Sequence, residues 1–271
     1  MTPKNYNDNF HEVHFQNSLN SAQEVVPLFL SYFKPENVLD VGCGLGTWMS
    51  VFNQNQCDVY GIDGDYVEIN SLIVEKNKFK AYDLNNTFNL GKKFDLVISL
   101  EVAEHILPDN AKKFIGSLCG HSDVILFSAA IPGQEGTMHH NEQYNQYWVD
   151  IFLDNGYECI DFLRHKIWNN TKISWWYRQN ILVFIKKSEL DNPYYKMILE
   201  ENRRFLNTYV HPELLEYKCR KISRLEERNA VLEKRLVNPY SFFKFYLKRV
   251  ILKIKNKCII KKSKGKKNLK V

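Results

Sequence analysis

The 271-residue chain lacks the features that mark disulfide-rich, metal-finger and membrane-spanning proteins. Its six cysteines form no C-x-x-C pair and no metal-finger spacing. No segment reaches the roughly 18 consecutive apolar residues of a membrane-spanning helix, and the polar N-terminus lacks the apolar core of a signal peptide. These absences predict reduced thiols and a cytoplasmic location.

Acidic residues are missing from the C-terminal segment. From Asn238 onward the chain has twelve Lys or Arg residues and no Asp or Glu, so residues 1–237 carry 25 basic and 31 acidic side chains. The chain has a net charge of +6 only because of this tail, since the rest of the chain is net negative. A net-negative main part is not typical of a non-specific nucleic-acid binder, so nucleic acid is not an expected partner.

The most informative segment that is present spans residues 38–48 and reads VLDVGCGLGTW. Apolar residues around Asp40 predict a buried strand, and Gly42, Gly44 and Gly46 predict a turn that opens a helix. Glycines permit positive φ and let a ligand approach the free N–H groups of the helix start. Their strict alternation differs from the G-x-G-x-x-G spacing of dinucleotide-binding turns, which argues against NAD.

This segment resembles the first motif of the class I S-adenosylmethionine (SAM) methyltransferases. The resemblance implies an α/β fold with a Rossmann-like seven-stranded sheet and SAM as cofactor. Further strands are expected at 57–63, 80–84, 94–100, 123–130, 157–163 and 180–187, the last two antiparallel, after a leading helix around 21–33. Asp63 ends the second strand, where a carboxylate can accept both ribose hydroxyls. The expected cofactor contacts are Asp40, Gly42, Cys43, Gly44, Gly46, Asp63, Asp83, Leu84, Leu100 and Glu101.

The motif Glu101-Val102-Ala103-Glu104-His105 follows the expected strand at 94–100. We predict that it starts a helix, which would place Glu101 and His105 one turn apart with Glu104 beside them. With His139 or His140 from the loop after the fifth strand, these residues could hold Mg²⁺ or Mn²⁺, and His139 is the first candidate. Alternatively His139 acts as a general base without metal, supported by Glu104 and His105, or the motif is purely structural.

Aromatic and hydrogen-bonding side chains concentrate in two further segments, 131–148 and 168–180. This combination suits sugar rings, so we predict that both segments contact the acceptor. In the alternative interpretation the tryptophans belong to the core, and Arg178 pairs with a structural carboxylate and not with a substrate phosphate. The predicted acceptor contacts are His140, Asn141, Tyr147, Trp148, Trp176, Tyr177 and Arg178.

The chain also resembles methyltransferases encoded with bacterial capsule and surface-polysaccharide clusters, on residues 99–105, 131–134, 141–148 and 175–180. This resemblance implies O-methylation of a sugar, a sugar nucleotide or a glycan modification. Glu101, Glu104, His105 and one later histidine are also similar to the divalent-ion sites of plant small-RNA 2′-O-methyltransferases and ubiquinone-pathway O-methyltransferases. An RNA 2′-O-methyltransferase and a non-catalytic scaffold subunit with a SAM fold are therefore the alternatives.

Three regions are expected: a methyltransferase domain at 1–187, a helical segment at 188–237 and a basic amphipathic tail at 238–271. The helical segment has a heptad pattern, which predicts either a parallel homodimer or a helix that packs on its own domain. Its a and d positions hold Leu215, Lys218, Ile222, Leu225, Asn229, Leu232 and Leu236.

In the tail, Phe243, Leu247, Val250 and Ile254 share one helical face, and the basic side chains lie elsewhere. This pattern predicts peripheral binding to the anionic inner face of the membrane, and a solvated tail is the alternative.

Truncation after Val237 is expected to abolish binding to anionic vesicles and to leave methyl transfer to a soluble acceptor unchanged. Electrostatic attraction weakens as salt shortens the Debye length, so binding of the full chain should fall at high ionic strength. Sedimentation with vesicles that contain or lack anionic lipid, at two salt concentrations, measures this. Equal pelleting of full-length and truncated protein would contradict it.

Overall fold

The computed structural model describes residues 4–202, 209–237, 243–244 and 246–248. The chain divides into two units, Met1–Leu214 and Leu215–Val271, which are described separately below. Most of the predicted basic tail at 238–271 lies outside the described residues. Within the part of the chain that the structure describes, no helix has the length and apolarity needed to cross a membrane.

The first unit is built on a seven-stranded sheet with the strand order β3-β2-β1-β4-β5-β7-β6. β1 pairs in parallel with β2 and β4, β2 with β3, and β4 with β5, whereas β7 is antiparallel to both β5 and β6. The strands are β1 (Asn37–Val41), β2 (Asp58–Asp63), β3 (Phe79–Ala81), β4 (Leu96–Leu100), β5 (Val124–Ser128), β6 (Tyr157–Ile160) and β7 (Leu182–Lys186). This architecture confirms the predicted Rossmann-like sheet and its antiparallel last pair.

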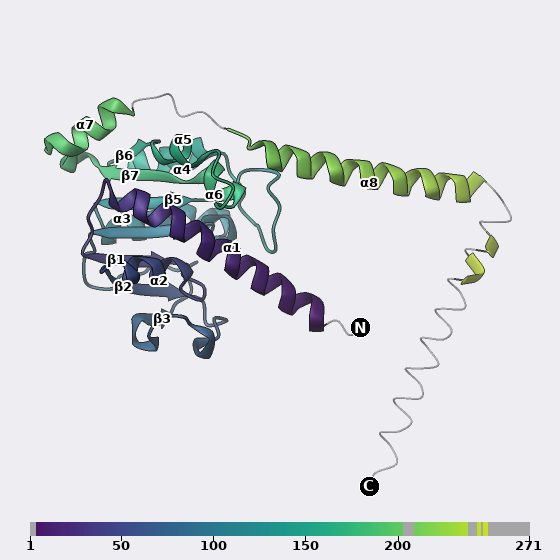
Figure 1. The fold of residues 1–271 in the computed structure, drawn as a ribbon, viewed down its shortest axis with the longest axis horizontal. Helices are drawn as coiled ribbons and strands as arrows, with labels where there is room; N and C mark the ends of the chain where they lie inside the picture. The colour runs from purple at the N-terminus through teal and green to yellow at the C-terminus, as the bar shows by residue number, and fades with distance from the viewer. Residues whose placement is uncertain (1–3, 203–208, 238–242, 245, 249–271) are drawn as a thin grey trace, which may run out of the picture. The chain divides into compact units, whose positions relative to one another are not determined.

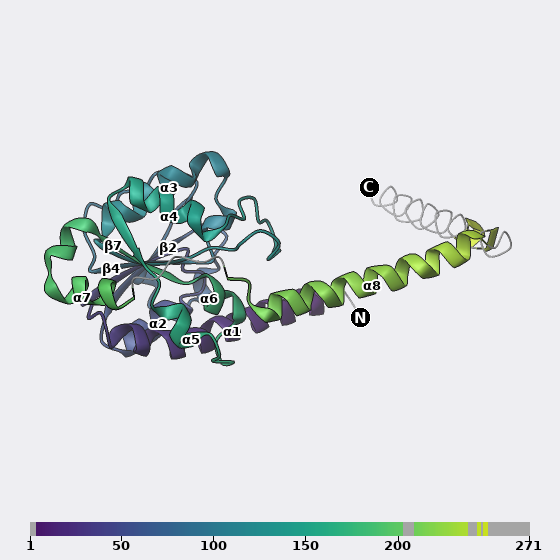
Figure 2. The same ribbon diagram turned by 90° about the horizontal axis from the view of Figure 1, so that it is seen from above.

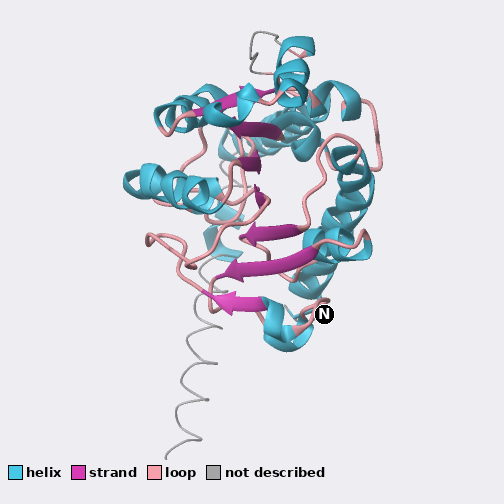
Figure 3. Cartoon of the chain, turned by 90° about the vertical axis from the view of Figure 1, so that its left-hand side faces the viewer, coloured by secondary structure: helices cyan, strands magenta, loops and turns pink. Residues whose placement is uncertain are grey.

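Helices cover both faces of the sheet (Figures 1 and 3). α1 (Lys4–Leu30), α2 (Thr47–Gln54), α5 (Leu163–Ile167) and α7 (Pro193–Glu201) contribute buried side chains to one core cluster, and α3 (Ala111–His121) and α4 (Asn145–Asp154) contribute to the other. Figure 2 shows α3 and α4 on one side of the strands, and α1 and α2 on the other. A parallel sheet needs this double cover because its strands are apolar on both faces, as the fully buried β4 and β5 are.

The predicted strands agree with the structure to within a few residues, but two helix predictions need correction. α1 starts at Lys4, far before the expected position near residue 21. No α-helix starts at Glu101: this residue has a left-handed φ of 58°, and two short 3₁₀ turns, Ala103–His105 and Pro108–Asn110, follow it. The next α-helix, α3, begins at Ala111.

The first unit extends to Leu214, beyond the expected domain boundary at residue 187. α7 packs onto the sheet through Ile198, which is 1% exposed, and the Tyr194 hydroxyl donates to the Tyr32 carbonyl. Leu214, at the start of α8 (Pro212–Val237), is also buried. The boundary therefore lies where α8 leaves this core.

A buried ion pair supports α6 (Trp175–Asn180), the helix next to β7. Arg164 on α5 is fully buried, pairs with Asp161, and donates from Nη1 to the Gln179 carbonyl at 3.2 Å. Loss of one partner of a buried pair leaves the other charge uncompensated. This pair consequently anchors the end of α6.

Replacement of Arg164 by Met is expected to lower the free energy of unfolding by about 3–5 kcal/mol, because Asp161 stays buried without its partner. Urea unfolding followed by circular dichroism measures the change. Lys166→Met on the exposed face of the same helix is the control and should cost less than about 1 kcal/mol. Equal losses in the two variants would contradict the role of the pair.

Candidate functional site

The glycine turn between β1 and α2 has the geometry that its sequence predicts. Gly42, Gly44 and Gly46 all have positive φ, at 86°, 53° and 86°. A Cβ on Gly42 would lie 2.3 Å from the Val102 side chain, whereas one on Gly44 would meet no atom of the described residues within 4 Å. The turn therefore packs tightly below Gly42 and leaves space above Gly44, where a ligand can approach the backbone.

Asp63, the last residue of β2, faces this turn. One of its carboxylate oxygens accepts from the Gly44 N–H at 2.7 Å, and the other accepts from the Gly64 N–H and the Tyr66 hydroxyl. Asp40 lies in β1 beside them, where burial and the nearby Asp63 charge raise its pKa well above the ordinary value. The neutral form of Asp40 is thus favoured at this strand edge.

The remaining predicted cofactor contacts lie near the ends of their strands. Asp83 and Leu84 follow β3, where the Asp83 carboxylate accepts from Asn85 N–H and Asn86 Nδ2. Leu84, Leu100 and Cys43 are buried, and burial raises the pKa of the Cys43 thiol. The parallel strands end at one edge, so these residues share the edge that holds Asp63.

Glu101 belongs to a buried network of amide side chains and not to a helix face. Its carboxylate accepts from Gln134 Nε2 at 2.6 Å and from Asn180 Nδ2 at 3.1 Å. Its own N–H donates to the Ser128 carbonyl at 3.0 Å, which joins the ends of β4 and β5. Burial raises the pKa of Glu101, and the hydrogen bonds from Asn180, Ser128 and Gln134 oppose that rise. A non-glycine residue with a left-handed φ at such a position is typical of a functional site.

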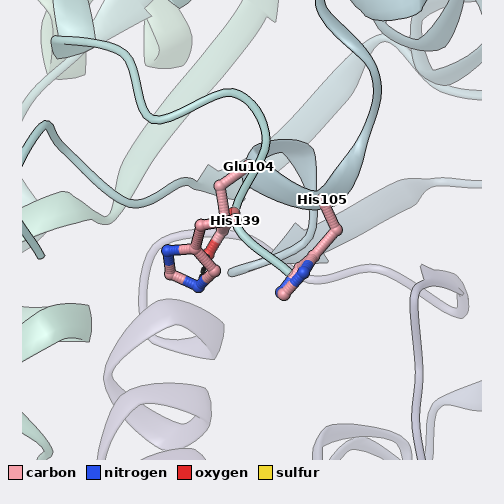
Figure 4. A group of neighbouring side chains, drawn as sticks. All are labelled: Glu104, His105 and His139. Carbon is pink, nitrogen blue, oxygen red and sulfur yellow. Dashed lines mark ion pairs between the residues drawn. The ribbon is translucent and has the colours of Figure 1, made fainter. Parts of the chain in front are cut away.

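Glu104, His105 and His139 form a second cluster, drawn in Figure 4. One ligand atom from each lies within 4.8 Å of the others, and the two imidazole rings are 4.9 Å apart at 87°. Burial and the charge of Glu101 raise the pKa of Glu104 well above its ordinary value. Burial and the neighbouring His139 lower the pKa of His105. The structure thus joins three of the four predicted metal ligands, and Glu101 turns to the amide network.

Glu142, which the sequence analysis left without a role, positions His139. One of its carboxylate oxygens contacts His139 Nδ1 at 2.8 Å and accepts from the Glu135 N–H at 2.7 Å, and the other accepts from the Gly133 N–H. The Glu104 carbonyl accepts from the N–H groups of His140 and Asn141. These contacts fold the loop of residues 131–143 over the 3₁₀ turn and bring His139 to Glu104.

The predicted acceptor contacts separate into two groups. Trp148 is 1% exposed and packs on Phe127 in the core, and Tyr177 is buried against Trp48, so both belong to the hydrophobic core, contrary to prediction. Arg178 pairs with Glu213 and donates to the Trp168 carbonyl at 2.9 Å. This agrees with the alternative interpretation, in which Arg178 pairs with a structural carboxylate and not with a substrate phosphate.

The other predicted acceptor contacts keep some exposure or lie beside the cluster. Tyr147 and Trp176 are partly buried, and the His140 side chain is exposed. Asn141 is buried next to Glu104.

Sequence reasoning gave no role to Gln134, Gln179 and Asn180, whose side chains hydrogen-bond to one another around Glu101. All three are buried. The signal for Gln179 and Asn180 was a short polar run just before the apolar β7, because polar side chains that are buried need hydrogen-bond partners. The partner could not be read from the sequence, since Gln134 and Asn180 stand far apart in the chain.

Comparison with known proteins adds independent evidence. The model of a family described as "Methyltransferase domain" matches residues 14–179. Over 185 residues the chain is 28% identical to carboxy-S-adenosyl-L-methionine synthase 1 of Yersinia pseudotuberculosis serotype IB (strain PB1/+), which covers 60% of this chain and 74% of that protein.

Two solved structures show the range of similar folds. Magnesium protoporphyrin IX methyltransferase from Synechocystis PCC 6803 with bound SAH has a TM-score of 0.47 and 22% identity, over 64% of this chain and 84% of that one. An amino pentose methyltransferase from Micromonospora echinaspora has a TM-score of 0.49 and 13% identity, over 65% of this chain and 96% of that one.

Replacement of Asp63 by Ala is expected to abolish the micromolar affinity for SAM or S-adenosylhomocysteine, because it removes the carboxylate that faces Gly44 and would accept the ribose hydroxyls. Isothermal calorimetry measures the loss. Asp65→Ala, which removes an exposed carboxylate two residues away, is the control and should bind normally. Tight binding by the Asp63 variant, or binding of NAD in place of SAM, would contradict the assignment.

Proposed function

Since the chain belongs to the methyltransferase domain family and is a SAM-dependent methyltransferase, we propose that it methylates an oxygen atom of a sugar, a sugar nucleotide or a glycan modification. The proposal places this reaction in the assembly of a bacterial surface polysaccharide at the inner membrane face, with the basic tail as the membrane contact. The observation that carries the chemical part is the hydrogen bond between His139 Nδ1 and Glu142.

This hydrogen bond selects the tautomer of His139. A carboxylate oxygen can only accept, so Nδ1 carries a proton, and in the neutral ring Nε2 then keeps its lone pair. Nε2 lies 4.0 Å from a Glu104 carboxylate oxygen, and the His139 side chain is 12% exposed. His139 is therefore oriented as a general base, and the imidazolium that forms would in turn favour the charged form of the neighbouring Glu104.

The cofactor supplies an electrophilic methyl group on a sulfonium, so the protein has to align two reactants and remove one proton. Asp63 and the Gly44 backbone are the groups for the nucleoside end of the cofactor. His139 Nε2 would take the proton of the acceptor hydroxyl while the methyl group passes to the hydroxyl oxygen. The bond between the methyl carbon and the cofactor sulfur would break with its electron pair left on sulfur, so that neutral S-adenosylhomocysteine would be the leaving group. The proton stays on His139 until solvent removes it, and Glu142 holds the ring through both states.

A divalent cation is the alternative use of the same cluster. One oxygen of the Glu104 carboxylate is buried without a hydrogen-bond partner among the described residues, and burial raises the pKa of this group. A cation beside Glu104 would restore its charged form, so the residues fit Mg²⁺ or Mn²⁺. Glu104, His105 and His139 would hold the ion, and it would lower the pKa of an acceptor hydroxyl.

Replacement of His139 by Ala is expected to lower kcat by about 10²–10⁴, as for loss of a general base or a metal ligand, with SAM affinity nearly unchanged. Transfer of labelled methyl from SAM to a panel of sugar nucleotides, free sugars and RNA measures it. His140→Ala is the neighbouring control, because its exposed side chain lies outside the cluster, and it should change KM at most a few-fold.

Full activity of the His139 variant would remove this residue from the mechanism. If RNA is the only member of the panel that is methylated, the proposal that the acceptor is a sugar would be wrong. Treatment with EDTA separates the two mechanisms, because only a metal-dependent enzyme loses activity and regains it when Mg²⁺ or Mn²⁺ is added.

A further inference from the structure

A groove of about 570 Å³ lies between α1 and the segment that leads into α6. α1 contributes the amide side chains of Asn17, Asn20 and Gln23 to one wall. Trp175 and Trp176 contribute to the opposite wall, with their ring planes at 84° and their centroids 5.5 Å apart. The two indoles thus form an aromatic corner that faces amide groups.

The charged residues of the groove neutralise one another. Lys172 Nζ lies 2.9 Å from a Glu24 carboxylate oxygen, and this hydrogen bond lowers the pKa of Glu24. Arg178, at 3% exposure, pairs with Glu213. Two cations and two carboxylates leave the groove without net charge, which disfavours a phosphate or another anion as its ligand.

Unused hydrogen-bonding capacity remains on Arg178, one of the residues that line the groove. Arg178 Nε is buried and has no hydrogen-bond partner among the described residues. Such a donor can be satisfied by a neutral hydroxyl oxygen. A ligand that offers hydroxyl groups together with a flat apolar face matches both the amide wall and the indole wall.

We propose that this groove binds a neutral saccharide unit of the acceptor, stacked on Trp175 and hydrogen-bonded to the amides of α1. The proposal rests on the proposed function and adds a second contact for the glycan. α6 connects the groove to the reaction site, because Trp175 begins this helix and Asn180, which holds Glu101, ends it. The rise between these two residues is about 8 Å, so a sugar in the groove would bind beyond the unit that is methylated.

Saturation-transfer NMR of the full chain with chitotriose and cellotriose tests this site, with uridine diphosphate as the anionic probe. Saturation should reach at least one of the two neutral trisaccharides. Trp175→Ala should weaken that binding about tenfold, the scale of one lost aromatic contact. Trp175→Phe, which keeps an aromatic face, should restore most of it. Tyr144→Ala removes an aromatic side chain that is 54% exposed outside the groove, and this control should bind like the wild type.

The proposal would be overturned if neither trisaccharide binds, or if the Trp175→Ala variant binds a trisaccharide as tightly as the wild type does. Preferential binding of uridine diphosphate would also overturn it. The experiment measures binding and not methyl transfer. Sugar binding in the groove by an enzyme that methylates no sugar would therefore contradict the proposed function alone. Methylation of a glycan with the same KM in the Trp175→Ala variant would contradict the groove alone.

A second inference comes from α8. From Leu215 to Lys234 nearly every side chain is exposed, including Ile222 at 54% and Leu225 at 47%. An isolated helix is only marginally stable in water, and helices in proteins gain most of their stability from packing of an apolar face. The apolar stripe of α8 therefore needs a partner.

We infer that this partner is α8 of a second copy, in a parallel two-stranded coiled coil. Leu215, Ile222, Leu225 and Leu232 follow the a and d spacing, with Lys218 at one d position. Asn229 is at one a position, where a buried Asn favours two strands in register. The g and e positions pair opposite charges between parallel copies, Lys221 with Glu226 and Arg228 with Glu233. Identical copies thus satisfy both the apolar and the charged pattern.

Light scattering coupled to size exclusion measures the mass of the full chain. The wild type should be a dimer at micromolar concentration, and Leu225→Lys, which places a charge in the seam, should be a monomer. Glu227→Lys changes charge on the outer face and is the matched control, which should remain a dimer. A monomeric wild type, or a dimeric Leu225→Lys variant, would overturn the inference.

Discussion

Parallel pairing of the central strands is the constraint on which the site depends. Because β1, β2, β4 and β5 run in the same direction, their carboxyl ends meet at one edge. The glycine turn, Asp63 and Glu101 each follow a different strand, and this register alone brings them together. The N–H of Glu101, which donates to Ser128, holds the ends of β4 and β5 at a fixed spacing.

Buried carboxyl groups give this edge its chemical character. Burial raises the pKa of Asp40, Glu101 and Glu104, and the three groups differ in the partners that surround them. Glu101 accepts hydrogen bonds from amides, Glu104 lies beside two imidazoles, and Asp40 has an oxygen without a partner among the residues that the structure describes. Since an uncompensated buried charge is costly, Glu104 favours a proton, a cation or a protonated histidine next to it. This preference is what makes both the base mechanism and the metal mechanism chemically reasonable at one cluster.

The sequence by itself determined the sheet and the glycine turn. Short apolar runs bounded by polar residues specify buried strands wherever they stand in the chain, and the positive φ values at Gly42, Gly44 and Gly46 require glycine locally. Asp63 could be placed because it ends such a run at a fixed distance from the turn. These are properties of neighbours in the chain, so no knowledge of the tertiary structure was needed.

Only the tertiary structure decided the roles of residues whose partners are distant in sequence. Arg178 could have met a substrate phosphate, but the fold places Glu213 beside it, and Trp148 faces Phe127 in the core and not a ligand. The acidic motif at residues 101–105 has the spacing of a helix face, yet the left-handed backbone of Glu101 turns that carboxylate to Gln134 and Asn180. Each outcome depends on contacts between separate elements. Such contacts leave no periodic signal in the chain. The residues next to a side chain in sequence are the same whether that side chain contacts a ligand or another part of the fold.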